Sequence, residues 1–466
     1  MKRILLSLLL SFFTLLGYSS HMTGGEITWR CSSNGNYIFT LKVYRDCSGS
    51  QFTTSAQTID VTGHPSLTGI TANFVSVTDL TQPGCGIDCN TANDPGIPTG
   101  FGSIEEYVFR SGPINLGNFT PPATGWIFTW NLCCRNTLQN INGSSGFGMT
   151  LRSKMFSYNG QIVTPCLSNS PAFAERPQSA ICLGYSFTYN HTAIDVDFDS
   201  LTYAWDRPAD GFAPGLTILN YQAPYTTTSQ MPGNPTLDPN SGEVNINPAI
   251  GAANQGNFAT CVRVDEFRCN TKISEIYREI QVGLEICTGT VFGGGPNNPP
   301  NFQDPITNAP YVSITDTIIA GDSAFFKIKI SDTDINTSPF APQILTLECV
   351  GAALDSIYFA APNTGCSRPP CATLNRLTPY SFQAFDIILM NWKTNCNHLS
   401  RGLGCSTLSN VYTFVVKARD SFCPVPARKN VTVRIVVVEP PKLLPPKLHC
   451  LDVDTAGHVT LTWDPP

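Results

Sequence analysis

Three aspartates on alternate positions, Asp195, Asp197 and Asp199, are the residues best suited to chemistry in this chain. Carboxylates spaced in this way can converge on one hard cation, and calcium takes about six to eight oxygen ligands. Asp265 and Glu266 could supply further oxygens. We therefore predict a calcium site between two domains. In the alternative interpretation, the aspartates cap a turn by accepting hydrogen bonds from backbone N–H groups.

The acidic pattern occurs twice in the sequence. A gap-free alignment places Asp332 opposite the first of the three aspartates and Asp334 opposite the second. Two later blocks, 258–269 and 412–423, also align without a gap and share an alternating strand pattern, an acidic turn and a closing cysteine. The chain is therefore predicted to contain two related domains. The acidic pair of the second domain is a second candidate for calcium binding.

Two tryptophans form the other candidate ligand site. Trp126 and Trp130 are four residues apart, so they lie on the same face of a β-strand and could stack on a sugar ring. The alternative is that both belong to the core of a β-sandwich, where aromatic side chains of this kind usually pack. The sequence favours the core, and sugar binding stays as the second interpretation.

Catalysis has little support in the sequence. The histidines are scattered, no Gly-x-Ser-x-Gly or His-Glu-x-x-His motif occurs, and the adjacent acids Glu105 and Glu106 would diverge on a strand. We therefore predict that the protein is not an enzyme. A glycosidase needs only two carboxylates that face one cleft, so a secreted carbohydrate-binding or glycan-degrading protein is the alternative.

The chain contains 18 cysteines. Their close pairs lack the spacing of zinc sites, and in an exported chain many cysteines are typical of disulfides. The adjacent residues Cys133 and Cys134 cannot face the same side of a strand, so each is predicted to have its own partner. The candidates for structural disulfides are Cys31, Cys47, Cys85, Cys89, Cys133, Cys134, Cys166, Cys182, Cys261, Cys269, Cys287, Cys349, Cys366, Cys371, Cys396, Cys405 and Cys423.

Residues 1–20 have the order of a secretory signal peptide. Lys2 and Arg3 precede an apolar run over 4–16, and small and polar residues follow. The apolar run is shorter than the roughly 20 residues needed to cross a bilayer, and no comparable run occurs later. We therefore expect an exported protein that has no transmembrane segment after removal of the signal.

The composition predicts the fold class. Charged residues make up 13% of the chain, whereas glycine and proline number 37 and 36. A chain that is poor in helix-forming Lys and Glu and rich in turn formers favours strands over helices. We therefore predict an all-β protein of tandem β-sandwich domains. The net charge of −6 is mild and no basic patch occurs, so nucleic acid is not expected as a partner.

Proline and glycine runs divide the chain into segments. Residues 293–300 mix flexible glycine with proline, which cannot join a central strand, and 439–446 is a second proline-rich linker. The predicted divisions are a signal peptide at 1–20, an N-terminal β-sandwich at 21–163, a second sandwich at 164–290, a related third sandwich with a cysteine-rich insertion at 291–440, and a linker with an incomplete domain at 441–466.

The last segment resembles the opening of a fibronectin type III domain. Its apolar residues from Leu451 to Trp463 have strand spacing before the sequence Asp-Pro-Pro. A domain of this type needs about ninety residues to bury a core. We therefore expect the chain to continue beyond Pro466, where further domains and an anchoring signal would follow.

Several unusual motifs resemble those of the large gliding motility-associated surface proteins of bacteria with type IX secretion. They are residues 21–28, 44–47, 133–136 and 189–201, and they begin His-Met-Thr-Gly-Gly, Tyr-Arg-Asp-Cys, Cys-Cys-Arg-Asn and Tyr-Asn-His respectively. The resemblance covers most of the chain. It implies β-sandwich modules of the Ig-like and PKD/cadherin-like types, stapled by disulfides, at the bacterial cell surface.

The resemblance also implies a function. A protein of this family is expected to be an adhesin or structural scaffold, associated with gliding motility, whose partner is a surface polysaccharide or another surface protein. Two features depart from the family pattern. Phe198 stands where the Asp-x-Asp-Gly-Asp turn of the family has glycine, which bears on the metal role of the turn, and no sorting domain is present in this sequence.

Overall fold

A computed structural model gives the structure of the protein. It describes residues 22–47, 49–81, 89, 103–133, 135–177, 179–211, 216–286, 297–337, 340–355, 357, 366, 368–399, 409–423, 425–441 and 448–463. Within these ranges the elements are β-strands and short 3-10 turns, without an α-helix. The predicted fold class, all-β with tandem sandwiches and disulfides, is confirmed.

The first sandwich is a ring of strands. Its hydrogen-bonded order is β1 (Met22–Cys31), β2 (Tyr37–Asp46), β5 (Ile104–Ser111), β4 (Gly69–Asp79), β3 (Gln57–Thr62), β6 (Trp126–Leu132) and β7 (Met149–Met155). Strand β18 (Thr271–Glu285) then pairs with β7 at Ser274–Ile276 and with β1 at Arg278–Ile280, which closes the ring. The alternate residues of these strands fill the interior with apolar side chains.

The second sandwich shares strand β18 with the first. The long hairpin of β17 (Gly256–Arg268) and β18 is extended by β12 (Ser200–Trp205) and by β9 (Ala180–Cys182). A second sheet of β10 (Phe187–Asn190), β16 (Glu243–Ile246) and β15 (Thr236–Leu237) belongs to the same core. The boundary that the sequence places after residue 163 therefore falls inside one hydrogen-bonded, 11-stranded sheet, and the two sandwiches form one unit.

The third sandwich shares no sheet with the first two. One sheet has the order β19 (Asn301–Gln303), β21 (Ser323–Ser331), β27 (Phe385–Lys393) and β25 (Thr373–Leu374). The facing sheet has the order β20 (Ser313–Ile319), β29 (Arg428–Val438), β28 (Asn410–Arg419), β24 (Ile344–Gly351) and β26 (Tyr380–Gln383). Alternate residues of both sheets form a core around Trp392.

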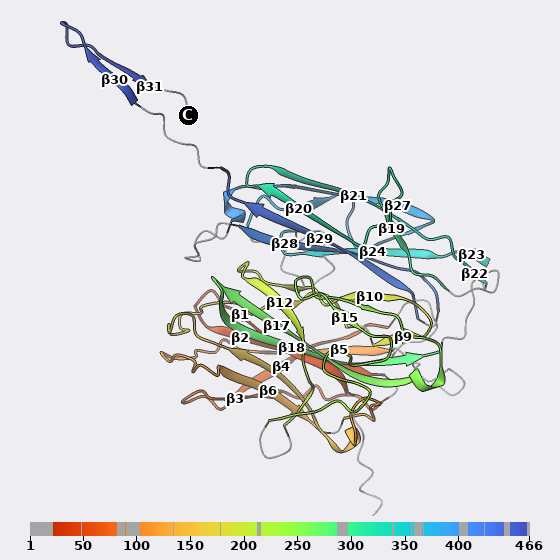
Figure 1. Cartoon of the computed structure of the whole chain (residues 1–466). Helices are drawn as coiled ribbons and strands as arrows, with labels where there is room; N and C mark the ends of the chain where they lie inside the picture. The colour runs from red at the N-terminus through yellow and green to blue at the C-terminus, as the bar shows by residue number, and fades with distance from the viewer. Residues whose placement is uncertain are drawn as a thin grey trace, which may run out of the picture.

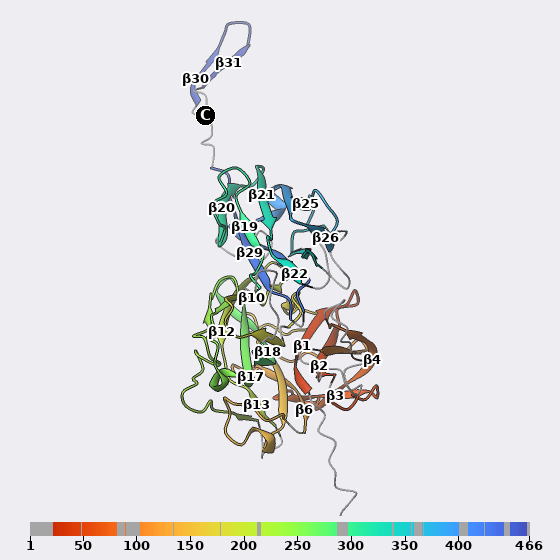
Figure 2. The ribbon, with the colours of Figure 1, turned by 90° about the vertical axis from the view of Figure 1, so that its right-hand side faces the viewer.

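The third sandwich stands on the second with its five-stranded sheet inward (Figure 1). Thr432 on β29 accepts a hydrogen bond from the Asn190 side chain at 3.0 Å and donates one to Glu243 at 3.0 Å. Lys417 on β28 forms an ion pair with Glu175 of the second sandwich. The turned view shows the same stacking, with β10 next to the third sandwich and the hairpin of β30 (Leu448–Val453) and β31 (Val459–Trp463) beyond it (Figure 2).

Three disulfides are resolved between described cysteines: Cys31–Cys166, Cys47–Cys89 and Cys366–Cys371. Cys133, Cys182, Cys269 and Cys423 are also disulfide-bonded. The prediction was wrong for Cys261, Cys349 and Cys396, which are free thiols. Both Cys261 and Cys349 are buried, and Cys349 packs in the core of the third sandwich as a small apolar residue. Cys85, Cys134, Cys287 and Cys405 lie outside the described residues, as does the predicted signal peptide.

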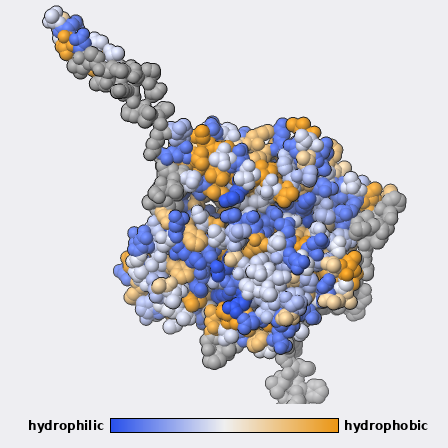
Figure 3. Space-filling view, in the orientation of Figure 1, coloured by the Kyte–Doolittle hydropathy of each residue, from blue (hydrophilic) through white to orange (hydrophobic). Residues whose placement is uncertain are grey.

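The described part of the chain contains no helix with the length and hydrophobicity of a membrane span. Hydrophilic and hydrophobic residues are interspersed over the face of the molecule in Figure 3. Strands β30 and β31 pair as an antiparallel hairpin in the segment where the sequence predicts two strands. The relation of this hairpin to a fibronectin type III domain remains a prediction.

Candidate metal centre at the joint between sandwiches

Asp195, Asp199 and Glu266 form a compact group, here called the first acidic cluster. The two aspartates lie in the turn before β12, and the glutamate projects from β17, which pairs with β12. One carboxylate oxygen of each residue lies within 4.8 Å of the others. The alternate spacing in the turn and the strand pairing therefore bring together three of the predicted ligands.

The first acidic cluster is buried. The exposed fractions are 4% for Asp195, 7% for Asp199 and 0% for Glu266. Burial, followed by the neighbouring carboxylates, raises the pKa of Asp195 and that of Glu266 well above their usual values. Oδ2 of Asp195 accepts no hydrogen bond. The cluster thus carries more negative charge than its surroundings neutralise, so it must hold either a proton or a cation.

One basic side chain compensates part of this charge. Arg268, at the end of β17, donates to both oxygens of Asp199 at 3.1 and 2.6 Å. Ser168 donates to Oε1 of Glu266 at 2.9 Å, and Ser274 donates to Oε2. These partners hold Asp199 and Glu266 in place and leave Asp195 as the carboxylate with a free oxygen.

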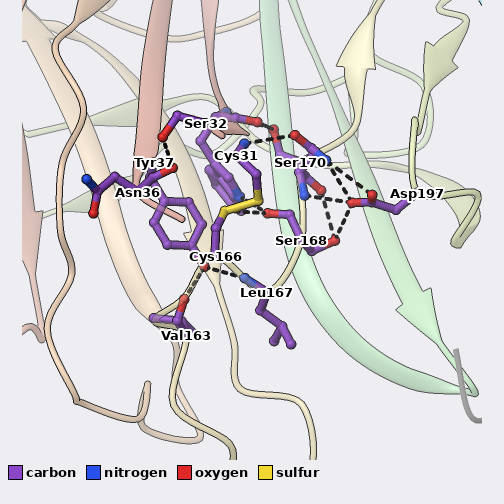
Figure 4. The surroundings of a disulfide bond; sticks show 12 residues. Cys31, Ser32, Asn36, Tyr37, Val163, Cys166, Leu167, Ser168, Ser170 and Asp197 are labelled. Atoms are coloured by element: carbon purple, nitrogen blue, oxygen red, sulfur yellow. Dashed lines mark hydrogen bonds between the residues drawn. A yellow bond between two sulfur atoms is a disulfide. The ribbon is translucent and has the colours of Figure 1, made fainter. Parts of the chain in front are cut away.

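A disulfide holds the segment after Cys166 next to this site. Cys31 on β1 is bonded to Cys166, and Ser168, which follows in the chain, lies beside Asp197 (Figure 4). Asn169 donates its backbone N–H to Asp197 at 2.7 Å, and its side chain also donates to Asp197. Asp197 therefore sits at the rim of the cluster, fixed by a segment that the disulfide ties to the first sandwich.

Phe198 connects the acidic turn to the third sandwich. Its ring is buried in the core of that sandwich, 5.2 Å from the ring of Tyr412. The guanidinium of Arg368 lies 4.4 Å from the Phe198 ring and also donates to the carbonyl of Asp197 at 3.2 Å. The first acidic cluster is therefore part of the joint between sandwiches.

The backbone of Phe198 explains its departure from the family pattern. Its φ is 65°, in the left-handed region that glycine adopts without strain. A side chain there costs about 1 kcal/mol, and the burial of the ring offsets this cost. The turn thus keeps the backbone conformation that glycine would adopt, while the Phe198 side chain packs into the third sandwich.

A second acidic cluster occupies the same place in the third sandwich. It consists of Asp332, Asp334 and Asp420. Asn298 donates its backbone N–H to Asp334 at 2.6 Å, and Asn297 donates its side-chain N–H to Asp420 at 2.6 Å. Asn297 and Asn298 therefore repeat the roles of Ser168 and Asn169.

The second acidic cluster has no basic partner among the described ion pairs. Burial raises the pKa of Asp332 to about 6 and that of Asp420 to about 7, and the neighbouring aspartates add to both shifts. Oδ2 of Asp332 and Oε1 of the buried Gln343 have no hydrogen-bond partner. Gln343 contacts the cluster through its side-chain N–H, which donates to Asn297 at 2.6 Å.

The structure corrects two parts of the site prediction. Asp265 points to the face of β17 opposite to Glu266, where it pairs with Arg263 at 2.8 Å and Lys272 at 3.1 Å. Trp126 and Trp130 are 0% and 2% exposed in the core of the first sandwich. Neither tryptophan can present a ring face to a sugar, so the core interpretation holds for both.

The first cluster fits a divalent cation in the distances between its oxygens, and the second offers oxygens of the right kind. Calcium prefers carboxylate, amide and carbonyl oxygens, and the free oxygens of Asp195, Asp332 and Gln343 are of these kinds. In the first cluster, Asp195, Asp199 and Glu266 would hold the ion; in the second, Asp332 and Asp420 are the candidate ligands. A bound cation would supply the positive charge that the buried carboxylates lack.

Sequence reasoning missed Asp420, Arg268 and Gln343. The alignment of 258–269 with 412–423 places Asp420 opposite Glu266, so the repeat contained the signal for this ligand. Arg268 and Gln343 left no such signal, because each reaches its cluster through the tertiary fold.

Comparison with known proteins gives only distant likenesses. No family model and no curated protein sequence matches the chain. Among solved structures, human CDH23 repeats EC21–23 align with 62% of this chain and 80% of their own at 13% identity and a TM-score of 0.17. Drosophila N-cadherin EC1–3 aligns with 71% and 83% at 14% identity and a TM-score of 0.18.

An endo-fucoidan hydrolase of glycoside hydrolase family 107 also aligns. The match covers 78% of this chain and 39% of the hydrolase, at 13% identity and a TM-score of 0.17. Scores this low define no common superposition, so no functional conclusion is taken from these likenesses.

Proposed function

We propose that the protein is a modular adhesin or scaffold of the bacterial cell surface whose joint is stiffened by calcium. The observation that carries the proposal is the position of the first acidic cluster. Its turn supplies both a carboxylate with a free buried oxygen, Asp195, and the ring of Phe198 that plugs the next sandwich. Cation binding at this turn would therefore fix the relative orientation of two modules.

A rigid series of modules suits adhesion. The disulfides cross-link loops outside the reducing cytoplasm, and the joint combines apolar packing with hydrogen bonds and the Lys417–Glu175 ion pair. Such an array holds a binding surface away from the cell. The association with gliding motility and type IX secretion rests on the sequence resemblance alone.

We propose a non-catalytic role for the acidic residues. The three carboxylates of the first cluster are at most 7% exposed, so a substrate could not reach them. A glycosidase requires carboxylates that face an open cleft on both sides of the scissile bond. The glycan-degrading alternative therefore has no support from this group.

Calcium titration of thermal unfolding tests the joint. We expect the melting temperature of the secreted protein to rise with millimolar calcium relative to EDTA, and to rise less in Asp195→Asn and Asp332→Asn. Asp265→Asn is the matched control, because this aspartate lies near Glu266 but outside the cluster. An unchanged wild-type melting temperature would exclude calcium stiffening.

Surface location needs a separate measurement. Antibody labelling of intact cells and brief protease treatment should detect the protein without lysis. Signal in the lysate only would contradict the proposed location.

A further inference from the structure

The two outer faces of the third sandwich differ in what covers them. The five-stranded sheet packs on the second sandwich through residues such as Thr432 and Lys417. The outer face of the four-stranded sheet β19-β21-β27-β25 points away from this joint (Figure 1). We call this outer face the distal face.

Strand register fixes which side chains form the distal face. Inward-pointing residues of β21 and β27 alternate with outward-pointing ones, and paired residues share a face. The distal face consists of Asn301, Gln303, Ser323, Phe325, Lys327, Lys329, Ser331, Thr373, Phe385, Ile387, Leu389, Asn391 and Lys393.

The distal face is basic on an acidic protein. Its three lysines, Lys327, Lys329 and Lys393, belong to no described ion pair, and none of its residues is acidic. Lys393 donates a hydrogen bond to the carbonyl of Gly321, which leaves its charge uncompensated. The net charge of the chain is −6. The local excess of positive charge therefore favours an anionic partner.

Two phenylalanines flank the lysines on this face. Phe325 is 53% exposed and Phe385 is 59% exposed. The ammonium of Lys327 lies 5.3 Å from the Phe325 ring, and that of Lys329 lies 5.6 Å from the Phe385 ring. Each pair combines an apolar ring with a cation, an arrangement that can contact the C–H face of a sugar and an acidic group on it at once.

The spacing of these pairs suits an extended ligand. Phe385 is opposite Ser331, six residues from Phe325, which corresponds to about 20 Å along a strand. The amides of Gln303 and Asn391 lie on the same face and can hydrogen-bond hydroxyl groups. A flat surface with ring, charge and amide groups in a row matches a linear chain of acidic sugars.

We propose that the distal face binds a linear anionic polysaccharide. The proposal deepens the proposed adhesive function, on which it rests, by naming the class of partner and the surface that contacts it. A second copy of the chain is the competing occupant, since its own acidic surface would also be attracted to the lysines.

Retention of the full secreted chain on immobilised dextran sulfate tests the proposal, with neutral dextran as the reference. We expect retention on dextran sulfate that falls with salt.

The apparent affinity should fall about tenfold in the triple variant Lys327→Gln, Lys329→Gln and Lys393→Gln, since it removes the positive charge of the face. The double variant Phe325→Ala and Phe385→Ala should also bind more weakly. Lys272→Gln and Phe340→Ala are the controls, because both residues lie off the distal face.

Three outcomes would overturn the proposal. In the first, the triple variant binds dextran sulfate as tightly as the wild type. In the second, polyglutamate binds as tightly as dextran sulfate and the phenylalanine variants have no effect. In the third, sedimentation shows that the protein dimerises through the distal face. The calcium-dependent joint is measured separately, because Asp195→Asn removes a ligand of the first cluster and should weaken calcium stabilisation without changing dextran sulfate binding. Absence of any calcium effect in the wild-type protein, with dextran sulfate binding retained, would contradict the calcium-stiffened joint and leave the proposal for the distal face intact.

Discussion

The first acidic cluster holds Arg268 against Asp199, whereas the second has Phe422 and Asn336 at the aligned positions. Both clusters otherwise share a plan: an Asp-x-Asp turn, an acid from a long strand, and a preceding segment that donates backbone and side-chain hydrogen bonds. The same backbone scaffold therefore carries two charge states. The first cluster has an internal cation, and the second depends on an external one or on protons.

This difference teaches how one repeat can serve two purposes. Arg268 is buried and fixes the geometry of the first cluster at all times. This permanent geometry suits a joint in which Phe198 must stay packed in the third sandwich. The second cluster keeps free oxygens on Asp332 and Gln343, which suits reversible cation binding. The variants below test this division, beginning with the largest expected effect.

Replacement of Arg268 by methionine should be the most damaging change. It leaves the buried carboxylate of Asp199 without its partner, and breaking a buried ion pair in this way costs about 3–5 kcal/mol. Urea unfolding of Arg268→Met measures the loss.

The double variant Asp199→Asn and Arg268→Met is the control for that loss. It gives the first cluster the uncharged pattern of the second and should recover much of the stability. If the single variant is as stable as the wild type, the arginine does not hold the cluster.

Truncation of Phe198 should uncouple the modules. Phe198→Ala removes a buried ring from the core of the third sandwich, at a cost of about 3 kcal/mol. Calorimetry should then resolve two unfolding transitions. Ile335→Ala is the matched control, since Ile335 holds the aligned position in the second cluster. A single unshifted transition in Phe198→Ala would contradict the role of the plug.

Calcium should stabilise through the second cluster more than through the first. A site saturated at about one hundred times its Kd adds about 2.7 kcal/mol. Asp420→Asn should abolish most of the calcium effect, and Glu266→Gln, the aligned change, should abolish less. Isothermal titration of both variants decides the order, and a larger loss in Glu266→Gln would reverse the division proposed here.

The last expected effect is on the pH dependence of stability in EDTA. The pKa of Asp420 is about 7 in the folded protein because of burial and Asp332, against about 3.9 in the unfolded chain. The folded state thus binds the proton more tightly, so the contribution of this group to stability is greatest below about pH 4 and is lost as the pH rises toward 7. Asp420→Asn should flatten this fall, and a fall unchanged in the variant would refute the assignment.

The sequence predicted the ligands that share a turn or a strand pattern. Asp195, Asp199 and Glu266 lie together because alternate spacing and strand pairing are local properties. Asp265 does not join them, because adjacent residues of a strand point to opposite faces. Arg268 was beyond prediction, since its partner Asp199 is distant in sequence and no periodic pattern connects them.

The fold class followed from composition, but the union of the first two sandwiches did not. The strand pattern of β18 predicts a strand and says nothing of its partners. Gly24 pairs with Ile280 across most of the two predicted domains, and a pairing of this range leaves no trace in local sequence. Cys261 and Cys349 were misassigned for a related reason, because burial in a core is decided by the tertiary fold.

The closure of the ring by β18 sets the order in which the protein can fold. Strands β1 and β7 have unpaired edges until β18 has been synthesised, and non-local pairing of this kind folds slowly. A nascent chain would therefore stay open through most of its first 285 residues. Synthesis of the β17–β18 hairpin is therefore the event that allows the whole N-terminal unit to reach its native state.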